Sequence, residues 1–447
     1  MAKSMRVRMY RVGFGDFFLI TVPTGSGPKH ILVDCGVYQG TSHEGDIGTI
    51  KTAVRHMADE TESKLALIIV THRHKDHIIG FSRCATEFEQ FSVDAVWMPI
   101  WETENDAKIQ EFQADLHQFA LNLGAALAGR DDPISEAIQG FVLNATGEGP
   151  GGGSNAESLR MLKTSFGVKP QYLARGDKAK LPSALQKAGL TAQILGPPPV
   201  DEPDFLKLKD LKKDVGQYLD NQHNAEPADG EQAQGLMPFQ PKYMASQSDY
   251  PANAFREWRD PNALEEGVRS STPAALYLAG ETLDNLLNNQ SLVVLFGWQG
   301  KQLLFAGDAQ AGNWEYWLYD EGVPARDPTG LELSDDSKKI LRDIDFYKVG
   351  HQGSTNATPI PAVTAMGSGF VSMCSTEDGT YGTVANDSEV PHGDLLAALA
   401  KKSAVVRSDQ IKVAEGDVKV PAAVHKQMPK PKSGKFEVGS CYVDYFL

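Results

Sequence analysis

The first hundred residues alternate short apolar runs with turn-forming residues. Polar and apolar positions alternate over residues 5–10, and β-rich runs follow at 17–22 and 30–34. The segment between these two runs is rich in Pro and Gly, which is typical of the turn in a β-hairpin. We therefore expect an antiparallel sheet near the start of the chain, followed by a helix over residues 46–58.

A different pattern occurs at residues 65–70, where the run LALIIV is apolar at every position. Such a run fits a strand that is buried on both faces, as in a parallel sheet. It leads directly into Thr71-His72-Arg73-His74-Lys75-Asp76-His77. A further strand is predicted at residues 93–99.

The pattern becomes helical over residues 102–140, and again over 154–166 after a Gly-rich stretch at 147–154. A strand is predicted at 192–195. Residues 200–269 are polar and weakly periodic, which indicates a long surface excursion with some helix.

Regular β patterning returns in the last third of the chain. Residues 291–298 and 302–306 predict a second hairpin, and residues 394–402 predict a helix. Single strands are predicted at residues 345–349, 369–374, 404–407 and 442–446. The Lys- and Pro-rich cluster at 426–435 is interpreted as a solvated loop.

Composition narrows the class of protein. The 447 residues are 41% hydrophobic and 23% charged, as in ordinary globular proteins. The net charge of −15 argues against a protein that coats DNA through a basic surface. The four cysteines are far apart and form no CxxC, so we expect buried free thiols. With no signal peptide and no apolar run of about 20 residues, the sequence predicts a cytoplasmic protein without a membrane span.

Three histidines and one aspartate fall within six residues: His72, His74, Asp76 and His77. On an extended strand, residues two apart share a face, so His72 and His74 point the same way. The following turn can bring Asp76 and His77 back toward them. Imidazoles with a carboxylate suit Zn²⁺, or Mn²⁺ where carboxylates are more numerous. A charged surface turn is the alternative, but such density is improbable with only 11 histidines in the chain.

Three further candidates stand at the ends of apolar strands. Asp34 follows HILV, Asp308 follows LLFAG and His351 follows FYKVG. Each has a glycine beside it or close by, and together they indicate strand ends that converge on one edge. A metal centre requires such convergence, because its ligands come from distant positions in the chain.

In combination these motifs resemble the metallo-β-lactamase superfamily, and in particular its ComEC-like domains. Those domains occur in bacterial DNA-uptake proteins and in soluble relatives. The resemblance covers roughly residues 5–100 and 285–410. It rests on segments that follow the family's order: VGFGD at 12–16, VDCG at 33–36, THRHKDHIIG at 71–80, NNQSLVVLF at 288–296, LLFAGDA at 303–309, KVGHQGS at 348–354 and PHG at 391–393.

The resemblance implies an α/β (α+β) fold, an αββα sandwich with metals at one edge and a large, partly helical insertion. Residues 1–101 would form the first half of the sandwich and 286–447 its second half and C-terminal closure. Residues 102–285 would be the insertion, with a returning strand near 192–196.

The resemblance also implies two divalent ions, zinc or manganese. His72 and His74 would bind the first ion. Asp76, His77 and His351 would bind the second, and Asp308 would bridge both. Asp34 would orient the ligands as a supporting group.

The sequence departs from the family pattern in two places. The usual third-motif histidine is absent, and Asn288 and Asn289 occupy that neighbourhood. An amide oxygen is a weaker zinc ligand than imidazole, so the first position would be loose or would take a harder ion such as Mn²⁺. Gln352 stands where relatives often carry a second histidine, which removes a proton donor near the substrate.

A mechanism follows from charge. Water between two divalent ions has a lowered pKa, so a bridging hydroxide is available to attack phosphorus or a carbonyl carbon. Asp76 or Asp308 would accept a proton. His392 would donate a proton to the leaving group, or else pack at a helix start.

Three residues near His351 are candidates for holding phosphate oxygens: Lys348, Ser354 and Thr355. The alternatives are a solvated strand-end lysine for Lys348, and turn or capping roles for Ser354 and Thr355.

The sequence thus predicts a metal-dependent phosphodiesterase, and more narrowly a nuclease acting on nucleic acid. Local cations also favour this substrate: Arg73, Lys75, Arg83 and Lys348. One alternative is hydrolysis of a small ester, lactone or thioester, which the acidic net charge favours. Another is a non-catalytic protein of a multi-protein system, such as defence, with a partner or a second copy bound through residues 102–285. The complete ligand set argues against the non-catalytic alternative.

Overall fold

A computed structural model describes residues 4–38, 49–127, 133–146, 154–207, 273–319, 332–381, 389–411 and 422–447. Residues 46–48 of the first predicted helix and residues 208–269 of the polar excursion lie outside the described residues.

Within these ranges, the larger sheet has eight strands in the order β15-β16-β1-β2-β3-β5-β7-β8. The strands are β15 (Lys435–Val438), β16 (Tyr442–Phe446), β1 (Arg6–Tyr10), β2 (Phe17–Val22), β3 (Lys29–Cys35), β5 (Leu67–Ile69), β7 (Val96–Pro99) and β8 (Gln171–Leu173). Pairing is antiparallel from β15 to β3 and parallel from β3 to β8. The wholly apolar β5 is buried at every position, as its sequence predicts.

The second sheet, counted over the same described residues, has six strands in the order β14-β13-β12-β11-β10-β9. They are β14 (Ser403–Arg407), β13 (Phe370–Cys374), β12 (Phe346–Lys348), β11 (Lys301–Phe305), β10 (Val293–Trp298) and β9 (Thr191–Gly196). Strands β9, β10 and β11 are antiparallel, and β11 to β14 are parallel. A small separate pair joins β4 (Lys64–Leu65) to β6 (Ser92–Val93).

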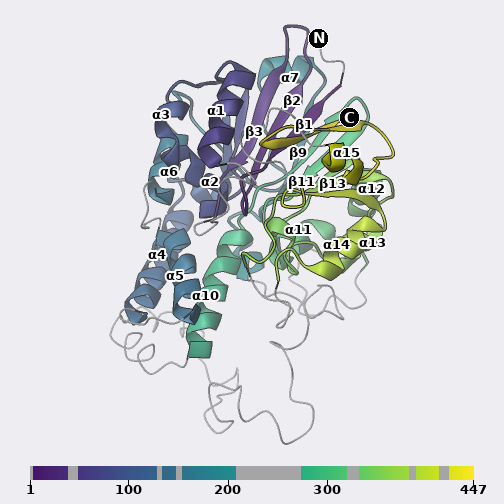
Figure 1. The fold of residues 1–447 in the computed structure, drawn as a ribbon. Helices are drawn as coiled ribbons and strands as arrows, with labels where there is room; N and C mark the ends of the chain where they lie inside the picture. Colours follow the sequence, from purple (N-terminus) through teal and green to yellow (C-terminus); the bar gives the residue numbers. More distant parts are fainter. Residues whose placement is uncertain are drawn as a thin grey trace, which may run out of the picture.

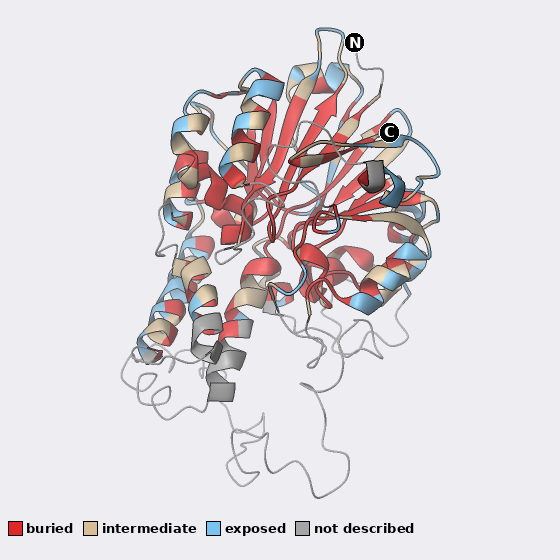
Figure 2. Cartoon of the chain, viewed as in Figure 1, coloured by how far each residue is buried: buried red, intermediate tan, exposed pale blue. Residues whose placement is uncertain are grey.

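The two sheets face each other across one apolar core. Phe18 of β2 meets Phe305 of β11 edge to face, with ring centroids 6.0 Å apart. Figure 2 shows the strands as the most buried part of the molecule. Because side chains from both inner faces form this core, packing fixes the position of one sheet relative to the other.

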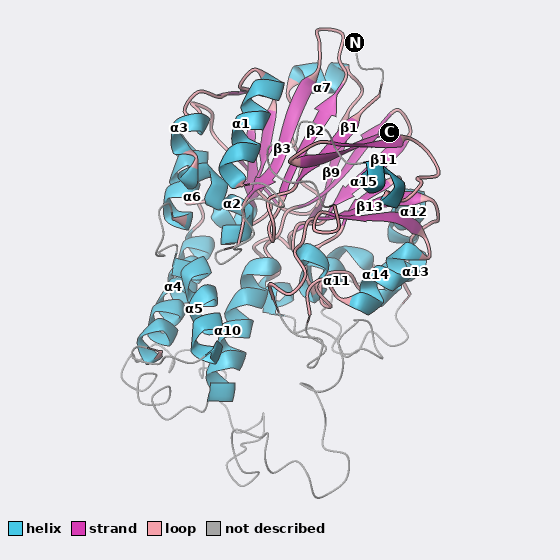
Figure 3. Cartoon of the chain, viewed as in Figure 1, coloured by secondary structure: helices cyan, strands magenta, loops and turns pink. Residues whose placement is uncertain are grey.

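Helices cover the outer face of each sheet (Figure 3). On the larger sheet lie α1 (Ile50–Thr61), α2 (Lys75–Arg83), α3 (Ala85–Phe88) and α6 (Asn155–Thr164). On the second sheet lie α11 (Ala311–Leu318), α12 (Asp335–Asp343), α13 (Ile360–Ala365) and α14 (Gly393–Ala400). The result is a mixed α/β fold in four layers: helices, sheet, sheet, helices. Short elements complete it: α7 (Ser183–Lys187), α15 (Ala422–Gln427) and the 3₁₀ turns η1 (Ile100–Glu102), η2 (Pro203–Lys207) and η6 (His351–Gly353).

Three more helices lie side by side beyond one end of the sheets (Figure 1). They are α4 (Ala107–Ala126), α5 (Pro133–Thr146) and α10 (Pro273–Asn288). They share a small apolar core that includes Leu116, Phe141 and Leu283. We call α4, α5 and α10 the helical unit. Helix α10 runs almost directly into β10, so the unit reaches the strand ends of the second sheet.

Most predicted elements are confirmed, including both hairpins and the strand at residues 192–195. The single strand expected at residues 65–70 is instead divided, because Leu65 pairs with Val93 in the small sheet. The solvated loop expected over residues 426–435 is wrong at both ends, since α15 reaches Gln427 and β15 begins at Lys435.

The insertion boundaries, 102–285, stay a prediction, but that range holds more than an excursion. Helix α6 packs on α2, and β8 extends the larger sheet beside β7. Strand β9 forms an edge of the second sheet beside β10. The described residues from α6 to β9 therefore belong to the layered part of the molecule.

Two expectations that were drawn from composition can be compared with the structure. The four cysteines are free and buried, as expected. No helix among the described residues is long and apolar enough to cross a membrane.

A candidate metal centre between the two sheets

The predicted site residues meet where strands from both sheets end. Asp34 lies at the end of β3, and the HRHKDH segment follows β5. Asp308 follows β11, and His351 follows β12. The Leu292 N–H donates to the Thr71 carbonyl over 2.8 Å, which ties the start of β10 to the histidine segment. The expected convergence on one edge is thus present.

Two glycines permit this close approach. A Cβ at Gly36 would lie 2.1 Å from the Asp76 carbonyl carbon. A Cβ at Gly307 would lie 2.8 Å from Thr71 Cβ, and Gly307 has a φ of +55°. Any larger residue at either position would force the chain segments apart, which explains the glycines beside Asp34 and Asp308.

His77 is the most constrained imidazole of the cluster. Its Nδ1 lies 2.8 Å from Asp34 Oδ2, and its Nε2 lies 3.0 Å from Asp308 Oδ2. Asp34 also accepts hydrogen bonds from the N–H and hydroxyl of Thr71. With Nδ1–H donating to Asp34, the His77 ring presents Nε2 toward Asp308. This is the arrangement in which a carboxylate orients a metal-binding histidine.

The ligand atoms of His72, His77 and Asp308 lie within 4.8 Å of one another. The His72 and His74 rings are adjacent, with centroids 4.5 Å apart. The Nε2 atoms of His72 and His74 are buried, and neither has a hydrogen-bond partner among the described residues. Burying an unpaired polar nitrogen is costly, so these atoms suit a bound cation. The residues present therefore fit a divalent metal ion.

The pKa values of the imidazoles diverge. Burial, followed by neighbouring imidazoles, lowers the pKa of His72 and His74 well below the usual value. Both rings are therefore neutral, which is the form that binds metals. Burial also opposes charge on His77, but the nearby carboxylates of Asp308 and Asp76 raise its pKa well above normal.

Asp308 is buried, yet His77 and Lys348 hold its pKa well below the usual value against the effect of burial. The backbone N–H of His351 also donates to Asp308 Oδ1 over 3.0 Å. This carboxylate is therefore ionised and surrounded by donors on several sides.

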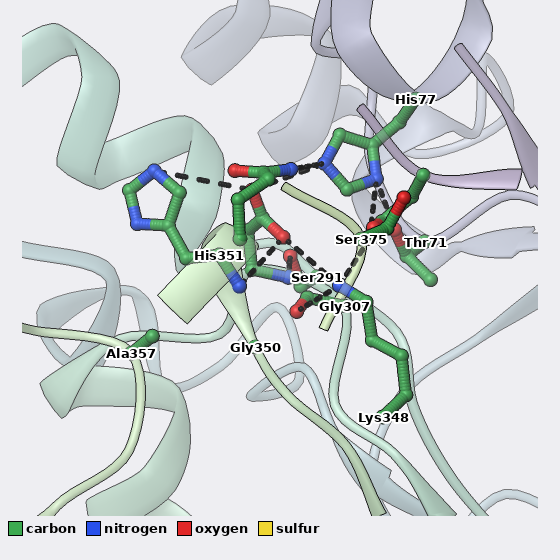
Figure 4. A network of polar contacts seen from close by, with 12 residues as sticks. Thr71, His77, Ser291, Gly307, Lys348, Gly350, His351, Ala357 and Ser375 are labelled. Atoms are coloured by element: carbon green, nitrogen blue, oxygen red, sulfur yellow. Dashed lines mark hydrogen bonds and ion pairs between the residues drawn. The ribbon is translucent and has the colours of Figure 1, made fainter. Parts of the chain in front are cut away.

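His351 approaches the cluster from the side opposite His77 (Figure 4). Its Nε2 is 3.9 Å from Asp308 Oδ2, and its Nδ1 is 3.2 Å from Asn356 Oδ1. The side chain is about 20% exposed, so it is the most accessible of the candidate imidazoles.

Asp76 lies beside His77, with Oδ2 3.5 Å from His77 Nε2. The amide of Gln352 donates to the same Asp76 oxygen over 3.0 Å. Burial raises the pKa of Asp76. Gln352 is fully buried with a φ of +48°, and its amide holds Asp76 in place.

Lys348 is buried, so the alternative of a solvated lysine is wrong. Its ammonium is ion-paired with Asp16, lies 3.5 Å from Asp308 Oδ1 and donates to the Gly307 carbonyl. The positive charge of Lys348 therefore faces the carboxylates of Asp16 and Asp308. Ser354 and Thr355 are also buried, directly after the η6 turn.

Asp16 is a site residue that sequence reasoning missed. It is about 1% exposed, pairs with Lys348 and lies 3.6 Å from His77 Nδ1. Burial raises its pKa to about 7, although Lys348 acts in the opposite direction. Asp16, Asp34 and His77 could themselves hold an ion, but Nδ1 of His77 already pairs with Asp34. We interpret Asp16 as support behind the ligands, and its only signal was its place in the VGFGD motif.

The cations near the site are less available to a substrate than the sequence indicated. Arg73 makes two hydrogen bonds to the Glu102 carboxylate, at 2.7 and 2.9 Å. Lys75 is about 8% exposed, and burial lowers its pKa. The charge of Arg73 is therefore neutralised within the protein.

The remaining predicted residues flank the cluster. His392 is buried just before α14, and its N–H donates to the Gly353 carbonyl over 2.8 Å. Asn288 ends α10, and its amide donates to Asp284 Oδ2 over 2.9 Å. Asp284, which the sequence did not single out, has Oδ1 3.6 Å from His74 Nε2.

No protein-family model matches this chain, and no curated protein is significantly similar to it. What the chain can do must therefore be inferred from the residues gathered at this edge of the two sheets.

Proposed function

We propose that this chain is a metallo-hydrolase of the metallo-β-lactamase type, which cleaves phosphodiesters and takes nucleic acid as its substrate class. The observation that carries the proposal is the buried cluster of His72, His77 and Asp308, with the unpaired Nε2 atoms of His72 and His74 beside it. Imidazoles and carboxylates gathered in a buried cluster are the donor groups of a divalent metal centre.

In this proposal, His72 and His74 hold one ion, and Asp76, His77 and His351 hold a second. Asp308 lies between the two sets. Bound divalent ions supply Lewis acidity and lower the pKa of water at the site.

The chain's own residues prepare this chemistry. Asp34 fixes the orientation of His77, and the charges of His77 and Lys348 keep Asp308 ionised. Asp76, whose pKa is raised by burial, is assigned the proton-accepting role at Oδ2. His392 is assigned the donation of a proton to the leaving group, because its backbone is bonded to the turn that carries His351.

The test is cleavage of single-stranded DNA, duplex DNA, RNA and bis-p-nitrophenyl phosphate with Mn²⁺, Mg²⁺ or Zn²⁺. We expect metal-dependent cleavage by the wild type and a loss of at least a hundredfold in Asp308→Asn and His77→Ala. His117→Ala, which removes an exposed histidine of α4, should leave the rate unchanged. A chain that binds metal but cleaves none of these substrates contradicts the proposal.

A small ester, lactone or thioester is the second candidate substrate. The net charge of −15 and the pairing of Arg73 with Glu102 leave little positive charge to attract a polyanion. Hydrolysis of these compounds without phosphodiester cleavage would favour this candidate. Metal binding with no hydrolysis at all would favour the non-catalytic alternative.

A further inference from the structure

The position next to His72 and His74 has only two imidazoles from the histidine segment. With Asp308 shared between the two sets, the ion at His72 and His74 would have three side-chain ligands, one fewer than a complete tetrahedral set. Helix α10 of the helical unit ends at this point, immediately before β10. The last turns of α10 are therefore the place to look for another ligand.

Asp284 lies one turn before the end of α10, and its Oδ1 is 3.6 Å from His74 Nε2. This separation is too long for a hydrogen bond. It does fit two ligands of one ion, because two atoms each about 2.1 Å from a tetrahedral ion stand roughly 3.4 Å apart.

The other oxygen of Asp284 is already held. Asn288, one turn further along α10, donates to Asp284 Oδ2 over 2.9 Å. This bond leaves Oδ1 on the side of His74. Burial, and then the charges of Asp76 and Asp284, raise the pKa of the Tyr38 phenol, as expected where both carboxylates face one side chain.

We propose that Asp284 is the additional ligand of the ion held by His72 and His74, and that Asn288 positions it. This inference rests on the metal centre of the proposed function. A carboxylate oxygen is a harder ligand than an imidazole nitrogen. The ion position at His72 and His74 should therefore favour Mn²⁺ over Zn²⁺. It also makes the helical unit a contributor to the metal centre.

The test is calorimetric titration of the metal-free full-length protein with Mn²⁺ and with Zn²⁺. We expect two ions per wild-type chain, and at least a tenfold loss of Mn²⁺ affinity at one position in Asp284→Asn. Asn288→Ala should weaken the same position less. Asp284→His should shift the preference at this position toward Zn²⁺, and the electron paramagnetic resonance of bound Mn²⁺ should change in parallel.

Asp115→Asn, at an exposed carboxylate of α4, is the matched control and should bind both ions as the wild type does. Thermal unfolding in chelator should be the same for all variants, which separates ligand loss from misfolding. Wild-type affinity for both ions in Asp284→Asn overturns the assignment, even where the wild type hydrolyses phosphodiesters. If the wild type binds two Mn²⁺ ions but hydrolyses no substrate, the proposed function is contradicted, whereas the assignment of Asp284 as a ligand still stands. A wild type that binds no divalent ion overturns both.

Discussion

Asp34 is the residue through which β3 controls the orientation of His77. It accepts hydrogen bonds from Thr71 and from His77 Nδ1, so one carboxylate orders both the strand end and the imidazole. In Asp34→Asn, the amide group would face the Thr71 and His77 donors with an N–H of its own. We expect metal affinity to fall by about ten- to a hundredfold, as for other residues that support metal-binding histidines. Titration with Mn²⁺ measures this affinity, and Asp59→Asn, at an exposed position of α1, should bind as the wild type does.

His30, on β3, allows a prediction about pH that is independent of the metal centre. Its Nδ1 lies 3.2 Å from Thr21 Oγ1, and burial together with Arg6 lowers its pKa to about 4. In the unfolded chain its pKa is about 6.5. Between these values only the unfolded chain binds the proton, so the free energy of unfolding falls as pH drops from 6.5 toward 4. Above 6.5 this effect is absent.

The corresponding measurement is urea unfolding of the metal-free protein at pH 7.5 and 5.0. At pH 5.0 the proton uptake should destabilise the wild type by about 2 kcal/mol. His30→Gln should lose less stability than the wild type between the two pH values, whereas His117→Gln should behave like the wild type. An identical pH dependence in His30→Gln would show that this imidazole is not kept neutral by the fold.

At the scale of single residues, the sequence identified the histidine segment and Asp34 beside it, but it missed Asp16 and Asp284. His72, His74, Asp76 and His77 are adjacent in the chain, so their spacing was visible. Asp284 and Asp16 reach the cluster only through the packing of α10 and of the loop after β1. A single sequence contains no record of such long-range contacts. The buried position of Lys348 was missed for the same reason, because a lysine at a strand end is ordinarily solvated.

At the scale of elements, α10 links the helical unit to the candidate metal centre. Leu283 is fully buried in the core of that unit, and Asp284 follows it directly. In Leu283→Ala the lost packing should destabilise the unit by about 2–5 kcal/mol. We expect faster amide hydrogen exchange in α10, and weaker Mn²⁺ binding because Asp284 is held less firmly.

Leu121→Ala on α4 is the control, because Leu121 is 44% exposed and its truncation should alter neither property. Unchanged exchange in Leu283→Ala would indicate that α10 is held mainly by its attachment to β10.

Elements with strong local patterns could be predicted, whereas two strands with weak patterns, β8 and β15, could not. Strands β2, β3, β10 and β11 have apolar runs bounded by turn residues, and all were expected. Strand β8 has three residues of which only Leu173 is buried, so its pattern carries no signal. Strand β15 is an edge strand with an exposed–intermediate alternation, which resembles a polar loop in the sequence.

At the scale of the whole molecule, charge predicts how the substrate is approached. The chain has a net charge of −15, and the nearby cations Arg73 and Lys348 are paired with carboxylates. Proteins that make 6–10 phosphate contacts lose about 10³–10⁵ in affinity between 50 and 200 mM salt. We expect a much shallower dependence here, with oligonucleotide affinity changing by less than about tenfold over that range. A steep slope would reveal a basic surface in another part of the chain.

The ligands of the candidate centre come from both sheets, with consequences for folding itself. The histidine segment follows β5 of the larger sheet, whereas Asp308 and His351 follow β11 and β12 of the second. An ion bound by ligands from both sheets would cross-link the sheets, and it could bind in this way only to the folded chain. At a concentration a hundred times its Kd, such an ion stabilises the fold by about 2.7 kcal/mol. A cell short of that metal would then lose the protein as well as its activity, because the metal-free chain unfolds and is degraded more often.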